Sequence, residues 1–88
     1  MAPEQLQPLT DAISHEVSRL TAEYHLKYGM ELDLAVSIDG AAGTVCVRGQ
    51  ALASWGPRQM LSARLDRAGL RHDTFVQSRT VVIYPSAT

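Results

Sequence analysis

The stretch Gly43-Thr44-Val45-Cys46-Val47-Arg48-Gly49 decides how the rest of the chain is interpreted. Its valines alternate with residues of other kinds, which is typical of a β-strand with one buried face. A glycine stands at each end, where the absence of a Cβ permits a turn, a bulge or close packing. We therefore predict a short strand bounded by glycines.

A second strand is predicted just before this one. Apolar residues alternate there with small or polar ones, and the apolar positions are Leu32, Leu34, Val36 and Ile38. Residues 39–43, Asp-Gly-Ala-Ala-Gly, have the composition of a turn. The two strands are therefore expected to form a β-hairpin.

A long helix is predicted ahead of the hairpin. Apolar residues recur at steps of three and four and mark one helical face: Leu6, Leu9, Ile13, Val17, Leu20 and Tyr24. We expect this helix to begin between Gln5 and Asp11, where Thr10 is able to cap it. It should end at Gly29, because glycine readily takes the left-handed conformation that closes a helix.

A second helix is predicted after the glycine-bounded strand. Ser54 can cap this helix, and Gly69 is expected to end it. Its apolar stripe consists of Leu61, Leu65 and Ala68. From residue 74 to residue 84 the chain is rich in β-branched and aromatic residues, which favours one long final strand, bulged near residues 78–79. A tight hairpin at that point is the alternative.

The order of these elements, α-β-β-α-β, predicts an α/β (α+β) fold. We expect a compact αββαβ two-layer sandwich, with two helices on one face of a small mixed three-stranded sheet. The length of 88 residues allows a single domain over residues 1–88, with a core at about 9–84 and short flexible tails.

The pattern of glycines and apolar residues resembles a BON domain, the bacterial module named for osmotic-shock and nodulation proteins. In that family a glycine opens a V-x-L/V-x-G strand, and a G-V pair opens the last strand. The matching positions here are Gly43, Val45, Val47, Gly49 and the pair Gly69-Leu70. The chain departs from the family at Trp55-Gly56-Pro57, which replaces a polar helix start. The resemblance implies a nonenzymatic module associated with phospholipid or membrane-surface binding and with adaptor roles.

Charge is unevenly distributed along the chain. Residues 1–40 carry seven acidic and two basic residues, a balance of −5, whereas residues 41–88 carry six arginines and two acidic residues, a balance of +4. Such asymmetry can mark a surface for an acidic partner, or two halves that face each other in the fold. Because the net charge is −1 and lysine is scarce, nucleic-acid binding is not expected.

The start of the chain, residues 1–5, lacks the features of a signal peptide. No apolar run approaches the ~20 residues that a transmembrane helix needs, so we expect no transmembrane segment. Without a signal peptide and with a single cysteine, the protein is expected to be cytoplasmic. Cys46 is the only cysteine, which excludes an internal disulfide.

No residue pattern indicates catalysis. Cys46 has no base near it in sequence, and no nucleophile elbow or phosphate-binding loop is present. His15, His25 and His72 are expected to be exposed to solvent, and contact between His72 and its neighbour Asp73 is not expected because adjacent strand residues point to opposite sides. We therefore predict no enzyme activity, no cofactor and no metal site.

The strongest surface signal is a group of arginines in and after the second helix, near a tryptophan. Its members are Trp55, Arg58, Arg64, Arg67 and Arg71. Arginines supply positive charge and an indole suits the membrane interface, so the group could bind anionic lipid headgroups. Alternatively, cations near a helix C-terminus stabilise the helix by ~0.3–1 kcal/mol through its dipole.

The sheet face opposite the helices is the second candidate surface. It should show Ala35, Ser37 and Cys46, together with either Val82 and Tyr84 or Val81 and Ile83 from the last strand. This set is less polar than a free surface usually is. The family resemblance and the arginines from 58 to 71 together predict a noncatalytic binding or adaptor module for anionic phospholipid or membrane surfaces. The alternative is a protein-interaction or self-associating module, a homo-oligomer, that uses the open sheet face.

Overall fold

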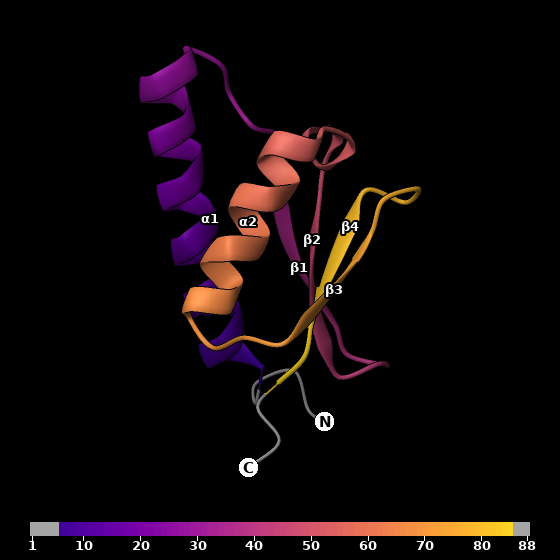
Figure 1. The fold of residues 1–88 in the computed structure, drawn as a ribbon. Coiled ribbons are helices and arrows are strands. Elements are labelled where there is room, and N and C mark those ends of the chain that lie inside the picture. Colours follow the sequence, from indigo (N-terminus) through magenta and orange to yellow (C-terminus); the bar gives the residue numbers. More distant parts are fainter. Residues whose placement is uncertain (1–5, 86–88) are drawn as a thin grey trace.

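The structure, a computed structural model, describes residues 6–85. Of the flexible tails predicted outside residues 9–84, residues 1–5 and 86–88 lie outside the described residues, whereas Leu6 is fully buried and residues 7 and 8 belong to the first helix. In chain order the elements are α1 (Gln7–Tyr28), β1 (Ala35–Asp39), β2 (Thr44–Arg48), the 3₁₀ helix η2 (Gln50–Ala53), α2 (Trp55–Arg67), β3 (His72–Phe75) and β4 (Thr80–Ile83). Figure 1 shows both helices on one side of the sheet, which confirms the predicted α+β class and its two layers.

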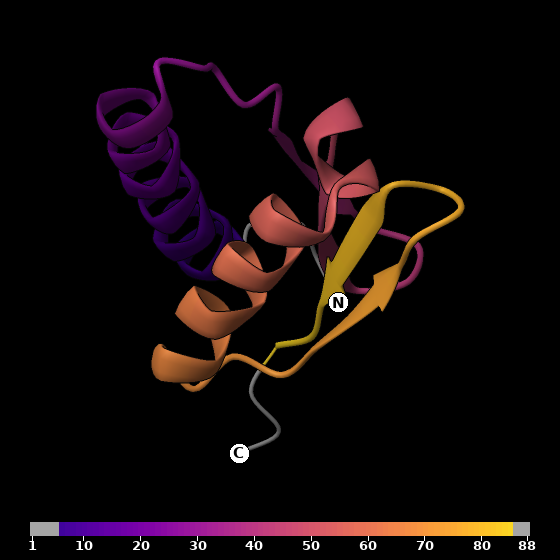
Figure 2. The ribbon, with the colours of Figure 1, turned by 45° about the horizontal axis from the view of Figure 1, so that its top comes forward.

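The sheet differs from the prediction in strand number and strand direction. It has four strands in the order β1-β2-β4-β3, and every neighbouring pair is antiparallel. The prediction of a mixed three-stranded sheet is therefore wrong. A second hairpin causes the difference, since β4 turns back from β3 and inserts between β3 and β2 (Figures 1 and 2).

This second hairpin also decides between the two interpretations of residues 74–84. The chain reverses over residues 76–79, where the backbone N–H of Arg79 donates to the carbonyl oxygen of Val76 at 3.1 Å. Arg79 adopts a positive φ of 51°, which lets the chain turn without a glycine. One long bulged strand is therefore wrong, and the hairpin alternative is confirmed.

The core lies between the helices and the sheet. The sheet contributes Val45 and Val47 from β2 and Val81 and Ile83 from β4, which alternate with residues on the other face. The helices cover them with their apolar stripes, and the buried helical residues include Ile13, Val17, Leu20, Leu61 and Leu65. Burial of each such side chain contributes ~1.5–3 kcal/mol, which is why the apolar periodicity specifies the packing.

The predicted ends of the helices are partly confirmed. α1 starts at Gln7, within the expected range, and ends at Gly29. Thr10 does not cap it, because its hydroxyl donates to the Leu6 carbonyl oxygen inside the first turn (2.9 Å). Ser54 precedes α2 as predicted, although its side chain makes no capping hydrogen bond. Ala68, predicted in the apolar stripe of α2, is exposed just after the helix ends.

The two glycines that bound β2 have different roles. Gly43 has a φ of 69° and completes the turn between β1 and β2. At Gly49 the reason is space, since a Cβ would lie 1.6 Å from the carbonyl oxygen of Asp33. Only a residue without a side chain permits this approach of two backbone segments.

Asp33 also organises η2, an element that the sequence did not indicate. Its carboxylate accepts hydrogen bonds from the backbone N–H groups of Gln50 (3.1 Å) and Ala51 (2.9 Å). These bonds lower the pKa of the Asp33 carboxyl group, and the bond from Ala51 has the larger effect. The capped turn directs Leu52 into the core, where its side chain is fully buried.

Candidate functional site

The structure does not bring the five predicted site residues into one patch. Trp55 is the first residue of α2 and its side chain is 69% exposed. Arg58 lies one turn further, and its Nη1 donates to the carbonyl oxygens of Leu52 (3.2 Å) and Ala53 (3.0 Å). These two residues lie at the end of the molecule where α2 begins.

Arg64 lies between the two helices and has acidic partners there. Its guanidinium donates to Glu16 at 3.2 Å and also to Glu23. The hydrogen bond with Glu23 raises the pKa of Arg64 and lowers that of Glu23. These ion pairs join α2 to α1. Only 14% of the Arg64 side chain is exposed, so it has little surface to offer a ligand. Arg67 is exposed beside it, at the end of α2.

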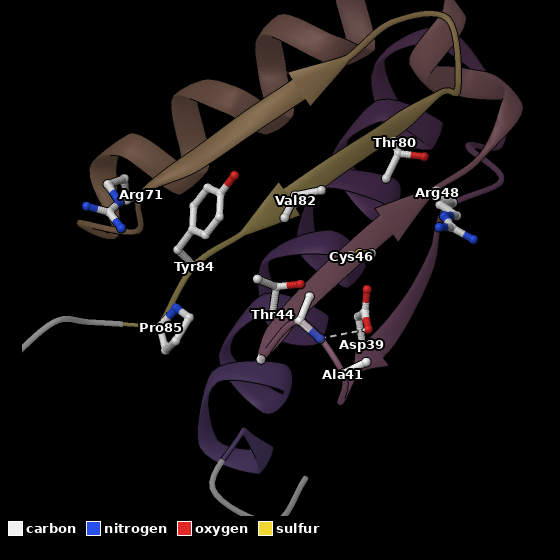
Figure 3. A pocket seen from close by; sticks show the side chains of 12 residues that line it. Asp39, Ala41, Thr44, Cys46, Arg48, Arg71, Thr80, Val82, Tyr84 and Pro85 are labelled. Carbon is white, nitrogen blue, oxygen red and sulfur yellow. Dashed lines mark hydrogen bonds between the residues drawn. The ribbon is translucent and has the colours of Figure 1, made fainter. Parts of the chain in front are cut away.

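Arg71 is separated from the other arginines. It follows α2 and precedes β3, and its guanidinium carbon lies 5.3 Å from the centre of the Tyr84 ring, a cation–π distance. Figure 3 shows Arg71 beside Tyr84, at the margin of a hollow on the sheet face opposite the helices. The five residues therefore occupy three different parts of the surface.

A different grouping is formed by the exposed apolar side chains. Among residues 6–85, the large apolar side chains that are exposed come from the last turn of α1 and the residue after its cap, the start of α2, and the hairpin between β3 and β4: Leu26, Tyr28, Met30, Trp55, Phe75 and Val76. Figure 1 shows these three segments towards the same end of the molecule, and Figure 2 shows the end of α1 and the turn between β3 and β4 on either side of α2. We call this set the apolar end.

Positive charge accompanies the apolar end. Lys27 lies 5.4 Å from the centre of the Tyr28 ring. Arg79 is exposed in the turn that follows Val76, and Arg58 is on the first turns of α2. Glu31 is an exposed acidic residue of this region, whereas the Asp33 carboxylate is occupied by η2.

Sequence reasoning included only Trp55 and Arg58 from this region. Leu26 lies outside the three- and four-residue steps of the α1 stripe and is 86% exposed. Its position on the helix therefore indicated an exposed apolar side chain. Phe75 and Val76 gave no such signal, because they are also typical of a strand interior.

The open face of the sheet is the surface opposite the helices. The strand register places on it Ala35, Ser37, Asp39, Thr44, Cys46, Arg48, Asp73, Phe75, Thr80, Val82 and Tyr84. Of the two alternatives for the last strand, the structure places Val82 and Tyr84 on this face with Cys46, while Val81 and Ile83 lie in the core. A hollow of about 630 Å³ lies over β2 and β4, with Arg48 at one end and Arg71 with Tyr84 at the other (Figure 3).

The floor of this hollow is already shielded from water. Cys46, Thr44 and Thr80 are buried although α1 and α2 both lie on the other side of the sheet. The Thr80 hydroxyl donates to the carbonyl oxygen of Ser78 at 2.9 Å. The face therefore combines a small, poorly solvated centre with charged residues at its margins.

His72 links α2 to the sheet. Its Nδ1 lies 2.9 Å from the Leu70 carbonyl oxygen and its Nε2 lies 2.8 Å from the Ser62 hydroxyl. A carbonyl oxygen only accepts, so Nδ1 carries a hydrogen, and in the neutral ring the Ser62 hydroxyl donates to Nε2. The imidazole thus connects β3 with the middle of α2.

The expected exposure of the histidines is confirmed for two of the three. His15 and His25 are exposed on α1, whereas the prediction is wrong for His72, whose side chain is only 8% exposed. Packing against α2 and the bond to Ser62 explain its burial. The adjacent Asp73 points to the other face, where it accepts a hydrogen bond from the Tyr84 hydroxyl at 2.7 Å.

Comparison with protein-family models, curated proteins and solved structures gives no match. The resemblance to BON domains therefore stays a prediction, and function has to be inferred from the geometry of the chain itself. Within residues 6–85, neither helix combines the length and apolar character needed to span a bilayer.

Proposed function

We propose that this protein is a noncatalytic binding module that associates with anionic membrane surfaces through its apolar end. The observation that carries the proposal is the presence of exposed apolar side chains from three separate elements at one end of the fold. Apolar side chains that are exposed as a group mark sites of interaction with a partner or a membrane.

The chemistry of the apolar end suits a lipid–water interface. Trp55 and Tyr28 combine an apolar ring with a polar group, as residues at that interface typically do. Leu26 and Val76 can insert below the headgroups, while Lys27 can contact anionic phosphates. A fluid lipid surface adapts to side chains from separate elements, whereas a protein partner has to match their shape.

The experiment measures binding to vesicles with the single tryptophan as the reporter. Because Trp55 belongs to the apolar end, its fluorescence should shift to the blue when the protein binds phosphatidylglycerol vesicles. Vesicles of phosphatidylcholine alone should bind much less, and physiological salt should weaken binding relative to low salt because it screens the attraction. Flotation of the same vesicles measures binding independently of the fluorescence.

Two double variants with the same change of charge test the location. Lys27→Glu/Arg79→Glu removes two cations of the apolar end and should weaken binding by more than about tenfold. Arg19→Glu/Arg67→Glu makes the same change on the exposed helix surface away from that end, and should retain most of the binding. Absence of vesicle binding by the unmodified protein, or equal loss in the two variants, would contradict the proposal.

A further inference from the structure

The open face of the sheet has a distribution of charge and side-chain size that is complementary to itself. We propose that it pairs with the open face of a second copy of this chain, about a two-fold axis that runs parallel to the strands between β2 and β4. Because the strand order is β1-β2-β4-β3, this rotation places β1 opposite β3 of the second copy, and β2 opposite its β4. Two sheets packed in this way lie ~10 Å apart, with their strands aligned to within about 30°.

The charges at the two edges of the face match under this rotation. Asp39 ends β1 at one edge of the sheet, and Arg71 precedes β3 at the other edge. The pairings of Asp39 with Thr44, and of Tyr84 with Arg71 through a 2.9 Å backbone hydrogen bond, place both charges at the same end of the strands. Asp39 therefore lies opposite Arg71 of the second copy, and the symmetry repeats this ion pair.

Side-chain sizes across the face also match. Each large ring lies opposite a short side chain: Tyr84 opposite Thr44, and Phe75 opposite Ala35. The ring of Tyr84 from one copy would occupy the hollow over β2 of the other. Such interdigitation is what close packing between two sheets requires.

The centre of the face adds an apolar contact. Cys46 lies opposite Val82 of the second copy, twice, and Cys46 is already buried in the single chain, so little water has to be removed from it. The two Arg48 side chains are the like charges closest to the axis, and they lie at the end of β2 next to η2. The two positive charges repel each other, so a variant without this charge should form the dimer at least as well as the unmodified chain.

The direction of the axis has a consequence for membrane binding. A rotation about an axis parallel to the strands keeps both apolar ends on the same side of the dimer. Both copies could then contact one surface together, and the second contact would form at high effective concentration. This consequence rests on the proposed membrane function, whereas the pairing of the two open faces does not.

The experiment is sedimentation equilibrium without lipid, over a wide range of protein concentration. The unmodified chain should change from monomer to dimer as concentration rises. Asp39→Arg and Arg71→Asp should each shift the equilibrium strongly towards monomer, because each single change sets like charges opposite each other. The double variant Asp39→Arg/Arg71→Asp should restore the dimer, since it recreates both ion pairs with reversed sign.

Two controls separate pairing from folding and from overall charge. Circular dichroism checks that each variant is folded, because Asp39 also accepts a 3.1 Å hydrogen bond from the Ala42 N–H in its own turn. Arg48→Ser should leave the dimer intact or strengthen it. A chain that stays monomeric, or a dimer that is indifferent to the single changes or is not restored in the double variant, would overturn the proposal. Lipid is absent, so each of these outcomes is independent of the proposed membrane function.

Discussion

The two hairpins of the sheet differ in how they are connected to the rest of the protein. β1 and β2 meet in a turn that ends at Gly43, and the segment before β1 is tied to η2 through the Asp33 carboxylate. β3 and β4 meet in a turn without glycine, closed by Arg79 in a left-handed conformation. Beyond its first residue β3 is exposed along its length.

This difference separates a structural hairpin from one that is suited to present residues. The first hairpin contributes Val45 and Val47 to the core. Directly after it, the backbone of Gly49 packs closely against the backbone of Asp33. The second is anchored at its base by His72 and Ser62, and its tip exposes Phe75 and Val76. A hairpin tip with few buried contacts can place side chains against a partner without a large effect on the core.

The largest effect is expected from removing the close backbone contact of the first hairpin. Gly49→Ala would place a Cβ 1.6 Å from the Asp33 carbonyl oxygen, so the segments have to separate, at a cost of ~1–3 kcal/mol. Urea unfolding measures this loss. Gly56→Ala is the matched control, because its Cβ meets nothing within 4 Å and it lies in α2. It should be neutral or stabilising by up to ~1 kcal/mol. Similar losses in both variants would contradict the close contact.

A smaller effect of opposite sign is expected in the turn of the second hairpin. Arg79→Gly relieves the left-handed conformation of a residue that has a Cβ, and should stabilise the fold by up to ~1 kcal/mol after the entropy cost of glycine. Ser78→Gly is the control, since Ser78 has no positive φ and its hydroxyl bonds the Phe75 carbonyl oxygen. It should destabilise the fold. A loss of stability in both variants would show that the turn is not strained at Arg79.

The smallest effect is expected in the dependence of stability on pH. The hydrogen bonds from Ala51 and Gln50 lower the pKa of Asp33 in the folded state. The stability that they contribute is therefore present above the unfolded pKa of about 3.9 and is lost as pH falls through the lower folded pKa. Asp33→Asn removes this titration, so its unfolding free energy should fall less steeply below about pH 4. Identical slopes for variant and parent, measured by urea unfolding at several pH values, would contradict this role.

The helices and the first hairpin could be predicted because their signals are local. The steps of three and four along α1 identified Ile13, Val17 and Leu20, which are all buried. Alternation in β2 separated Val45 and Val47 from Cys46, and the structure places them on opposite faces. Each of these patterns depends on the backbone period of one element and needs no knowledge of its neighbours.

The candidate site was harder to predict because it depends on which elements meet. Their spacing in sequence suggested that the arginines from 58 to 71 form one group. In the structure Arg64 forms ion pairs with Glu16 and Glu23 of α1. Arg71 lies beside Tyr84 on the opposite face of the sheet. The apolar end brings together segments that are about twenty residues or more apart in sequence. No pattern within one segment reveals such a grouping.

The sequence by itself determined the class of fold, most of the buried stripes of both helices and the first hairpin, since apolar periodicity and turn residues act over a few positions. Only the tertiary structure decided that residues 72–83 form a hairpin whose second strand pairs with β2, because strand pairing is a contact between distant segments. It also decided which cations remain accessible. Arg64 is held between two carboxylates of α1, while Arg79 stays exposed in the turn beside Val76.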